Sequence, residues 1–274
     1  MQAWQHCVEQ VRLSRRWPMW HTANMQFDTA TGPLTVNIPD LTALCDAVEA
    51  RFAAGEGFAI ATLNLDHLVK LRRDAGFSRA YLAQDFVTAD GNPVVWCCRR
   101  AGQDVALVPG SDAIVPLARV AARLGRKIAL VGSTQDALEA AAEGLQAQVS
   151  GVEVSHIIAP KMGFDPDGSN AREILATLQA DKVGLCFLAL GAPKQERLAA
   201  LGRQISPGVG FASIGAGLDF IAGRQTRAPR WVRRFALEWL WRMLGNPRRL
   251  VGRYLRSALI LPGLWLSAGR QRPR

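Results

Sequence analysis

Long uninterrupted apolar runs are absent from this sequence of 274 residues. A helix needs about 18 to 20 predominantly apolar residues to span a bilayer. The longest candidate, Ala258–Leu266, is shorter than that and is interrupted by Pro262 and Gly263. The N-terminal stretch also lacks the apolar core of a secretory signal peptide. We therefore expect a protein that does not cross a membrane.

Metal-site and disulfide patterns are missing as well. The sequence has five cysteines and four histidines, with no C-x-x-C pair and no other metal-ligand spacing. A scattered, odd set of cysteines in a chain of this length is typical of reduced core thiols in a cytosolic protein. A zinc site is therefore not expected. The cysteines are Cys7, Cys45, Cys97, Cys98 and Cys186.

Lysine is absent, and acidic residues are nearly absent, from residues 224–274. This tail holds 13 Arg and a single acid, Glu238, and so carries a net charge of +12. The whole chain carries +10, so residues 1–223 carry the difference, −2. A cationic tail on a near-neutral body calls for an anionic partner, such as phospholipid, nucleic acid or a pyrophosphate.

Short apolar runs alternate with helical patterns from about residue 57 onward. Runs such as KIALV show little polar–apolar alternation, which is typical of strands buried on both faces of a parallel sheet. The alternation predicts a Rossmann-like, doubly wound α/β fold with a mostly parallel sheet, which binds ligands beyond the carboxyl ends of its strands. The predicted strands are Gly57–Asn64, Val87–Asp90, Val105–Val108, Lys127–Val131, Val152–Ile158, Val183–Leu190 and Val209–Ile214. The predicted helices are Asp66–Arg73, Asp112–Leu124, Thr134–Gln148, Asn170–Gln179 and Pro193–Gln204.

The composition divides the chain into three parts. Near Gly223 the strand pattern stops and arginine becomes dense. We predict an N-terminal extension over residues 1–25, an α/β domain over 26–222 and a basic, helical appendage over 223–274.

One candidate site follows the strand Val183–Leu190. Gly191 permits a tight exit from the strand, and Pro193 suits the first position of a helix. The start of that helix, with Lys194 beside it, would favour an anion such as a diphosphate. The alternative interpretation is a well-capped helix without a ligand, and this motif alone favours the alternative.

A second candidate follows the strand Val87–Asp90. A carboxylate at a strand end can point into the ligand cleft and take a proton from a hydroxyl group, so Asp90 is a candidate general base. The alternative is a turn in which Asp90 only bonds its own backbone. Thr62 and Asn64, at the end of the first predicted strand, add neutral hydrogen-bonding groups at the same rim.

Three further loops carry polar or small residues. Ser111 and Asp112, after Pro109-Gly110, offer a helix cap and another contact for a phosphate or sugar. Small residues at Gly215-Ala216-Gly217 would let a ligand approach the backbone. Asp165 and Asp167 form an Asp-x-Asp pair of the kind that can hold a divalent cation. Because turn-forming residues surround that pair, we interpret it as a turn.

The end of the chain predicts a basic amphipathic helix that starts at Pro247 and ends near Pro262. At 100° per residue, Arg249, Arg253 and Arg256 fall within about 60° of one another. Such a helix would lie in the headgroup plane of an anionic membrane, with Trp265 as an interfacial anchor. The alternative is an ordinary helix that docks on the body. The predicted apolar side contains Leu250, Val251, Tyr254, Leu255, Ala258 and Leu261.

Together these motifs resemble the WecG/TagA/CpsF family of bacterial glycosyltransferases, from about Phe27 to about Leu261. Two departures from the family pattern are Asn92-Pro93, where members often have a second glycine, and Arg197-Leu198, where a tryptophan is common. The motifs that carry the resemblance are Thr62-x-Asn64, Asp90-Gly91, Gly110-Ser111-Asp112, Leu190-Gly191-Ala192-Pro193-Lys194-Gln195-Glu196, Gly215-x-Gly-x-Asp-Phe-x-Ala-Gly223, Arg227-Ala228-Pro229, Leu237-Glu238-Trp239-Leu240-x-Arg242 and Pro247-Arg248-Arg249.

The resemblance implies an inverting transferase that uses a UDP-sugar and needs neither a metal nor a cofactor. The donor would be UDP-N-acetylmannosamine, slightly favoured, or UDP-glucose, and the acceptor a sugar on polyprenyl pyrophosphate, in cell-surface or exopolysaccharide synthesis. The enzyme would work at the cytoplasmic face of the plasma membrane, bound to the anionic membrane surface without binding nucleic acid. A homo-oligomer remains open.

The resemblance also implies roles for individual residues. Asp90 would be the general base, Thr62 and Asn64 would line the sugar pocket, and Gln195 would lie near the donor. Other predicted substrate contacts are Ser111, Asp112, Gly191, Lys194, Arg242, Arg249 and Arg253, the arginines reaching the pyrophosphate.

The sequence features suggest two other functions. A nucleic-acid-binding protein would explain the arginine-rich tail but would leave the strand-end motifs without a role, and the chain has no recognised binding motif. A nicotinamide-dependent oxidoreductase would suit the doubly wound pattern, but no G-x-G-x-x-G follows the first strand.

Overall fold

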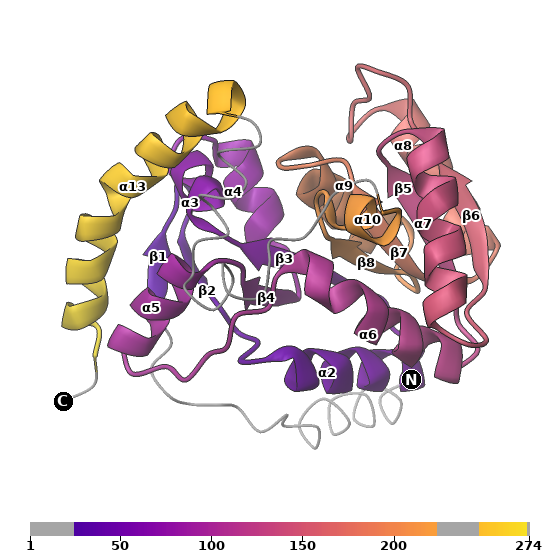
Figure 1. Ribbon diagram of the computed structural model, residues 1–274, viewed down its shortest axis with the longest axis horizontal. Helices are drawn as coiled ribbons and strands as arrows, with labels where there is room; N and C mark the ends of the chain where they lie inside the picture. Colours follow the sequence, from indigo (N-terminus) through magenta and orange to yellow (C-terminus); the bar gives the residue numbers. More distant parts are fainter. Residues whose placement is uncertain (1–24, 224–246, 273–274) are drawn as a thin grey trace, which may run out of the picture.

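The computed structural model describes residues 25–223 and 247–272. Its centre is a six-stranded parallel sheet with the order β4-β3-β8-β7-β5-β6, which confirms the predicted doubly wound α/β fold (Figure 1). The strands are β3 (Phe58–Leu63), β4 (Phe86–Ala89), β5 (Lys127–Gly132), β6 (Val154–Ile158), β7 (Val183–Ala189) and β8 (Gly210–Ser213).

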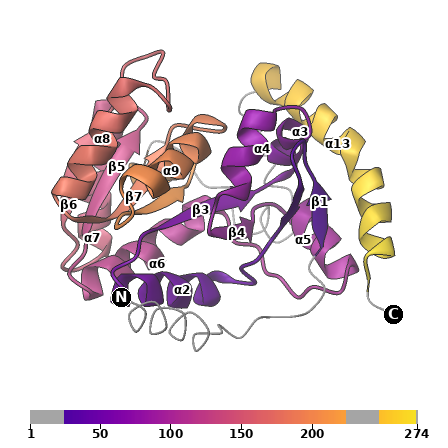
Figure 2. The same ribbon diagram turned by 180° about the vertical axis from the view of Figure 1, so that it is seen from behind.

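Helices cover both faces of the sheet. On one face α2, α6, α7 and α10 pack on one another, and on the other α4 and α8 flank α9 (Figures 1 and 2). The described helices are α2 (Leu41–Ala53), α3 (Leu65–Leu71), α4 (Ala75–Leu82), α5 (Asn92–Arg100), α6 (Gly110–Arg123), α7 (Gln135–Gln148), α8 (Ser169–Ala180), α9 (Lys194–Ile205), α10 (Gly217–Ile221) and α13 (Pro247–Arg270).

The sheet is buried on both sides because its strands are apolar at nearly every position. Alternate residues of β5 point to opposite faces: Leu130 joins the core under α6 and α7, and Val131 joins the core under α8 and α9. Cys97, Cys98 and Cys186 are free and buried, which confirms the prediction of reduced core thiols for these residues.

The prediction of a strand at Val105–Val108 is wrong. This segment makes only isolated backbone bonds, from Ala106 N to Pro39 O and from Val108 N to Ala89 O. Val105 and Val108 are buried, so their apolar character reflects burial in a connecting segment rather than strand pairing.

A short antiparallel hairpin, β1 (Gln26–Asp28) and β2 (Pro33–Thr35), was not predicted. It lies against the last helix, since the Gln271 side chain accepts from Gln26 N at 2.7 Å and donates to Gln26 O at 3.0 Å. Met25, just before β1, is fully buried.

Helix α13 packs on the body through α3 and α5. Ser257, Leu264 and Ala268 are buried on its inner side, and Arg100 of α5 lies 4.6 Å from the Trp265 ring centroid. The predicted end near Pro262 is wrong, because the helix continues to Arg270. Pro262 removes the N–H bond to the carbonyl of Ala258, and both residues are exposed, so water can satisfy that carbonyl.

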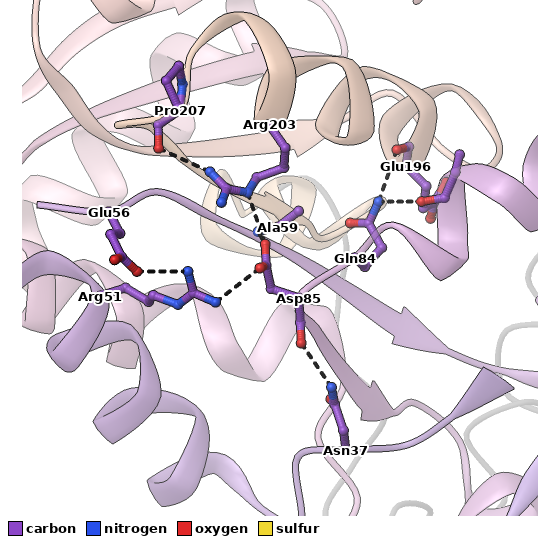
Figure 3. A network of polar contacts seen from close by, with 10 residues as sticks. Asn37, Arg51, Glu56, Ala59, Gln84, Asp85, Glu196, Arg203 and Pro207 are labelled. Carbon is purple, nitrogen blue, oxygen red and sulfur yellow. Dashed lines mark hydrogen bonds and ion pairs between the residues drawn. The ribbon is translucent and has the colours of Figure 1, made fainter. Parts of the chain in front are cut away.

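A polar network holds the amino ends of the central strands (Figure 3). Asp85, just before β4, accepts hydrogen bonds from Ala59 N at 2.8 Å, Arg51 at 3.0 Å and Arg203 at 3.0 Å. Arg203 also donates to Pro207 O at 3.0 Å. This one carboxylate therefore joins β3, α2 and the end of α9 at the edge opposite to the predicted site.

Candidate active site

The predicted site residues gather at the carboxyl edge of the sheet. Asp90 follows β4, Asn64 follows β3, Gly215 lies beyond β8 and Gly191 beyond β7, and these four strands are neighbours in the order β4-β3-β8-β7. Adjacent strands lie about 4.8 Å apart, so the four loops span roughly 14 Å. That width suits a nucleotide-sugar together with an acceptor hydroxyl group.

Asp90 is fixed at this edge through its backbone and its carboxylate. Its N–H donates to Leu63 O at 2.8 Å, and the Thr62 hydroxyl donates to Asp90 Oδ2 at 3.4 Å. Gly91, at φ 113°, then turns the chain into α5. Asp90 is half-buried and Thr62 is nearly buried, so the predicted pair does meet at one point of the rim.

The Asn64 side chain is hydrogen-bonded to the local backbone. It is the N-cap of α3, and its Oδ1 accepts from His67 N at 3.0 Å. The cap fixes the entry of the chain into α3 directly after Thr62. Contact between Asn64 and a sugar stays a prediction.

The loop after β7 is tied to the loop after β8. The Oε1 atom of Gln195 accepts from Gly191 N at 3.2 Å and from Gly215 N at 3.1 Å. Gln195 is 2% exposed, so its amide serves mainly to join these loops. Lys194 is the first residue of α9 and half-buried; Pro193 is the N-cap, one residue earlier than predicted.

Ser111 and Asp112 lie in the first turn of α6. This helix begins at Gly110, two residues earlier than predicted, and its N-cap is Pro109 rather than a side-chain cap. Gly110 is needed here because a Cβ would lie 2.9 Å from Ile214 Cα, just beyond β8. Ser111 and Asp112 line a cavity of about 320 Å³ together with Val115, Gln148, Phe220 and Ile221.

The predicted arginine contacts are mostly outside the described residues. Arg242 lies in residues 224–246, outside the described ranges. Arg249 and Arg253 lie in α13, and the structure describes their backbone but not their side chains.

The turn interpretation of the Asp165 loop is confirmed. Asp165 Oδ1 accepts from Asp167 N at 3.1 Å, and Gly168 N donates to Asp165 O at 3.2 Å. The Asp167 carboxylate pairs with Arg197 of α9. Within residues 25–223 and 247–272, no group of three or more His, Cys, Asp or Glu residues is arranged to hold a metal ion.

Two charged residues near the site were missed by the sequence analysis. Glu196 is fully buried in the first turn of α9, and burial raises its pKa from 4.5 to about 7. Lys70 of α3 pairs with Asp66 at 2.9 Å and donates to Ala192 O at 3.5 Å. Glu196 belongs to the Leu190–Glu196 motif. Its burial results from the packing of α9 against α4, which the local sequence does not indicate.

Fold and candidate site together describe a doubly wound α/β protein with a carboxylate and glycine-containing loops at the carboxyl edge of its parallel sheet. The chain belongs to the glycosyl transferase WecG/TagA/CpsF family, whose model matches residues 32–274. It is similar to the N-acetylglucosaminyldiphosphoundecaprenol N-acetyl-beta-D-mannosaminyltransferase of Bacillus subtilis (strain 168). The two are 26% identical over 219 residues, which cover 78% of this chain and 83% of that protein. This chain is therefore a glycosyltransferase.

Within the described part of the chain, no helix combines the length and the apolar character needed to cross a bilayer.

Proposed function

We propose that this enzyme transfers N-acetylmannosamine from UDP to N-acetylglucosamine on polyprenyl diphosphate, in the synthesis of a cell-envelope polysaccharide. UDP-glucose is the second donor to test. The activity of the Bacillus subtilis relative supports this acceptor and this sugar. The structural observation that carries the proposal is the Thr62–Asp90 pair, at the same sheet edge as the joined Gly191 and Gly215 loops.

In the proposed reaction Asp90 is the general base. The acceptor hydroxyl oxygen attacks the anomeric carbon as its proton passes to the Asp90 carboxylate, and the bond from that carbon to the UDP oxygen breaks. A single displacement inverts the configuration at the anomeric carbon. Thr62, whose hydroxyl donates to Asp90, would hold the carboxylate in position, with Asn64 beside it on the sugar side.

The donor diphosphate would lie at the start of α9. Negative charge grows on the leaving UDP, and preorganised positive potential stabilises it. The helix dipole of α9 and the Lys194 ammonium group would supply that potential without a metal, next to Gly191, whose own N–H donates to Gln195 Oε1. Ser111 lies next to the loop after β8, since a Cβ at Gly217 would be 3.2 Å from its Cα, and Ser111 and Asp112 would contact the rest of the donor.

The acceptor and the membrane would meet at α13, within the proposed appendage 223–274. This helix docks on α3 and α5, which begin directly after Asn64 and after Asp90-Gly91. Its outer side exposes Leu255, Leu259 and Leu266, by 62%, 80% and 59%. Positions 255, 259 and 266 fall within about 40° on a helix, so they form one apolar stripe.

An apolar stripe on a basic segment suits the interface of an anionic membrane. We propose that the enzyme binds there on the inner face of the plasma membrane, with Arg242, Arg249 and Arg253 toward the acceptor pyrophosphate.

A donor panel tests the proposed reaction. UDP-N-acetylmannosamine, UDP-glucose and UDP-N-acetylglucosamine would be offered with a polyprenyl-diphosphate N-acetylglucosamine acceptor in detergent, and product would be followed by mass spectrometry. Transfer of N-acetylmannosamine is expected. Transfer of glucose alone would change the donor assignment, and transfer with none of the three donors would overturn the proposal.

Chelation tests the proposed metal independence. Turnover should be unchanged in EDTA, because helix dipoles and cationic side chains are proposed to stabilise the leaving group. Loss of activity that Mn²⁺ or Mg²⁺ restores would contradict this.

A further inference from the structure

The burial of the Glu196 carboxyl group is not accounted for by polar partners around it. Glu196 is 0% exposed, yet its carboxylate makes no ion pair among the described residues, and Oε2 is buried without a hydrogen-bond partner there. An unpaired carboxyl group in the interior lowers stability relative to an apolar side chain of similar size. A carboxyl group buried at such a cost in stability is expected to have a specific role.

The carboxyl group has one polar contact with another side chain. Glu196 Oε1 accepts a hydrogen bond from Gln195 Nε2 at 2.9 Å. Other polar groups near it do not replace this contact. Gln84 Nε2 donates to the backbone oxygen of Glu196 at 3.1 Å, and the Lys70 ammonium group pairs with Asp66 at 2.9 Å.

The contact decides which way the Gln195 amide points. Gln195 Oε1 accepts from the N–H groups of both Gly191 and Gly215. The flipped amide would turn its NH₂ group toward two N–H donors, and neither bond could form. An acceptor on the NH₂ side, which Glu196 provides, selects the orientation that joins the loops.

We infer that Glu196 is a positioning residue of this active site: it orients Gln195, and Gln195 joins the loops after β7 and β8 into one donor-binding unit. This inference rests on the proposed function, because it assigns those loops to the donor. It also explains why the two residues are adjacent. In the first turn of α9, Gln195 reaches the loop backbones and Glu196 lies behind it against the core.

Substitutions of Glu196 test the inference in the full-length protein. Glu196→Met keeps the volume and removes the acceptor, so the KM for the donor should rise about tenfold, the usual effect of one lost orienting hydrogen bond. The kcat should change less, because Glu196 contacts Gln195, whereas Asp90 is held by the Thr62 hydroxyl and the Leu63 backbone. Glu196→Gln can present a carbonyl oxygen to Gln195 Nε2 and should restore the KM of the wild type.

A matched control separates positioning from general destabilisation. Gln103 is also a buried residue (6% exposed), but its side chain bonds Met25 N and Val36 O rather than either loop. Gln103→Met should lower the thermal midpoint and leave the donor KM unchanged. If Glu196→Met does not fold, Glu196→Asp shortens the side chain by one methylene and should raise the KM in the same way.

A measurement that does not depend on turnover distinguishes this inference from the proposed function. Amide hydrogen exchange at Gly191 and Gly215 should be faster in Glu196→Met than in the wild type and in Glu196→Gln. Wild-type inactivity with every donor would overturn the proposed function, while the exchange rates would still test the link between the loops. An unchanged donor KM together with unchanged exchange at both glycines would overturn the inference.

Discussion

At the scale of single residues, Asp90 is the group on which the proposed chemistry depends. Asp90→Asn keeps the shape and the acceptor for Thr62 but removes the base, so kcat at saturating donor should fall about 10²–10⁴-fold. UDP binding, measured by calorimetry, and the circular dichroism spectrum should not change. Asp165→Asn, at a carboxylate that caps its own turn, is the matched control and should be fully active. Unchanged turnover of Asp90→Asn would exclude Asp90 as the base.

Glu196 predicts a pH dependence of stability. Burial raises its pKa from 4.5 to about 7, against smaller opposing effects of the hydrogen bond from Gln195 and the charge of Lys70. Below the pKa of the unfolded state, the Glu196 carboxyl group is protonated in both the folded and the unfolded protein, so its ionisation does not lower the free energy of unfolding. Between pH 4.5 and about 7 only the unfolded state ionises, so the free energy of unfolding falls as pH rises, and above pH 7 the loss is complete.

The two pKa values correspond to a loss of roughly 3 kcal/mol. Urea unfolding of the wild type and of Glu196→Gln between pH 4 and pH 8 measures it, because the glutamine variant lacks this titration. A difference between the two proteins that is constant over this range would contradict the assignment.

The sequence predicted the residues of the rim and Gln195, but neither the loop-joining role of Gln195 nor any role of Glu196. Asp90, Thr62, Gly191 and Gly215 could be predicted because the carboxyl ends of parallel strands share one edge. The tasks of Gln195 and Glu196 could not, since they depend on hydrogen bonds between loops separated by about 20 residues and on burial beneath α4.

At the scale of elements, the strands of the parallel sheet were predicted well, whereas helices α2, α4, α5 and α10 and the β1–β2 hairpin were not predicted. The six strands of the parallel sheet were predicted from their apolar runs. Helix α5 was missed because it begins with Asn92-Pro93, which has the composition of a turn, and the hairpin strands β1 and β2 have only three residues each. Val105–Val108 was wrongly predicted to be a strand because its apolar residues are buried outside the sheet. The end of the last helix was predicted too early, because the exposed Pro262 does not end a helix that is docked on the body.

The network around Asp85 joins β3, α2 and α9 and predicts a local contribution to stability. Asp85→Ala removes the acceptor of three charged or backbone donors and should lower the free energy of unfolding by about 2 kcal/mol. Glu56→Ala, which removes an exposed partner of the same Arg51, should cost less than about 1 kcal/mol. Equal effects of the two substitutions in urea unfolding would show that Asp85 does not join these elements.

The exposed and buried sides of helix α13 predict different effects of substitution, on membrane binding and on stability respectively. Replacement of Leu255, Leu259 and Leu266 by Ser should weaken sedimentation with anionic liposomes about tenfold, since these side chains are exposed on the protein. Thermal stability and activity toward a short water-soluble acceptor should be retained. Leu264→Ser, on the buried side of the same helix, should lower stability instead. Liposome binding by the triple variant equal to that of the wild type would exclude the stripe as the membrane contact.

At the scale of the whole molecule, the structure places the proposed membrane helix against α3 and α5, the helices that follow Asn64 and Asp90-Gly91. Helix α5 starts two residues after Asp90 and carries Arg100, which stacks on Trp265 of α13. The composition could predict a basic amphipathic appendage, but not that its inner side completes the core with Leu264 and Ala268. Deletion of residues 224–274 would therefore disturb folding as well as membrane binding, which makes the point substitutions the cleaner test.

The strand order also determines when the sheet can be completed. Neighbours β3 and β4 are close in sequence, as are β5, β6 and β7, but β8 must pair with β3, where Phe58 lies opposite Gly210. On the ribosome, β3 and β4 are therefore synthesised about 120 residues before β8, whereas β7 precedes β8 by only about 20 residues. Until β8 emerges, one edge of β3 and one edge of β7 stay unpaired and apolar, and such edges favour aggregation. The link between the Gly191 and Gly215 loops forms only after that step, so the proposed donor site is assembled later than the β3–β4 part of the sheet.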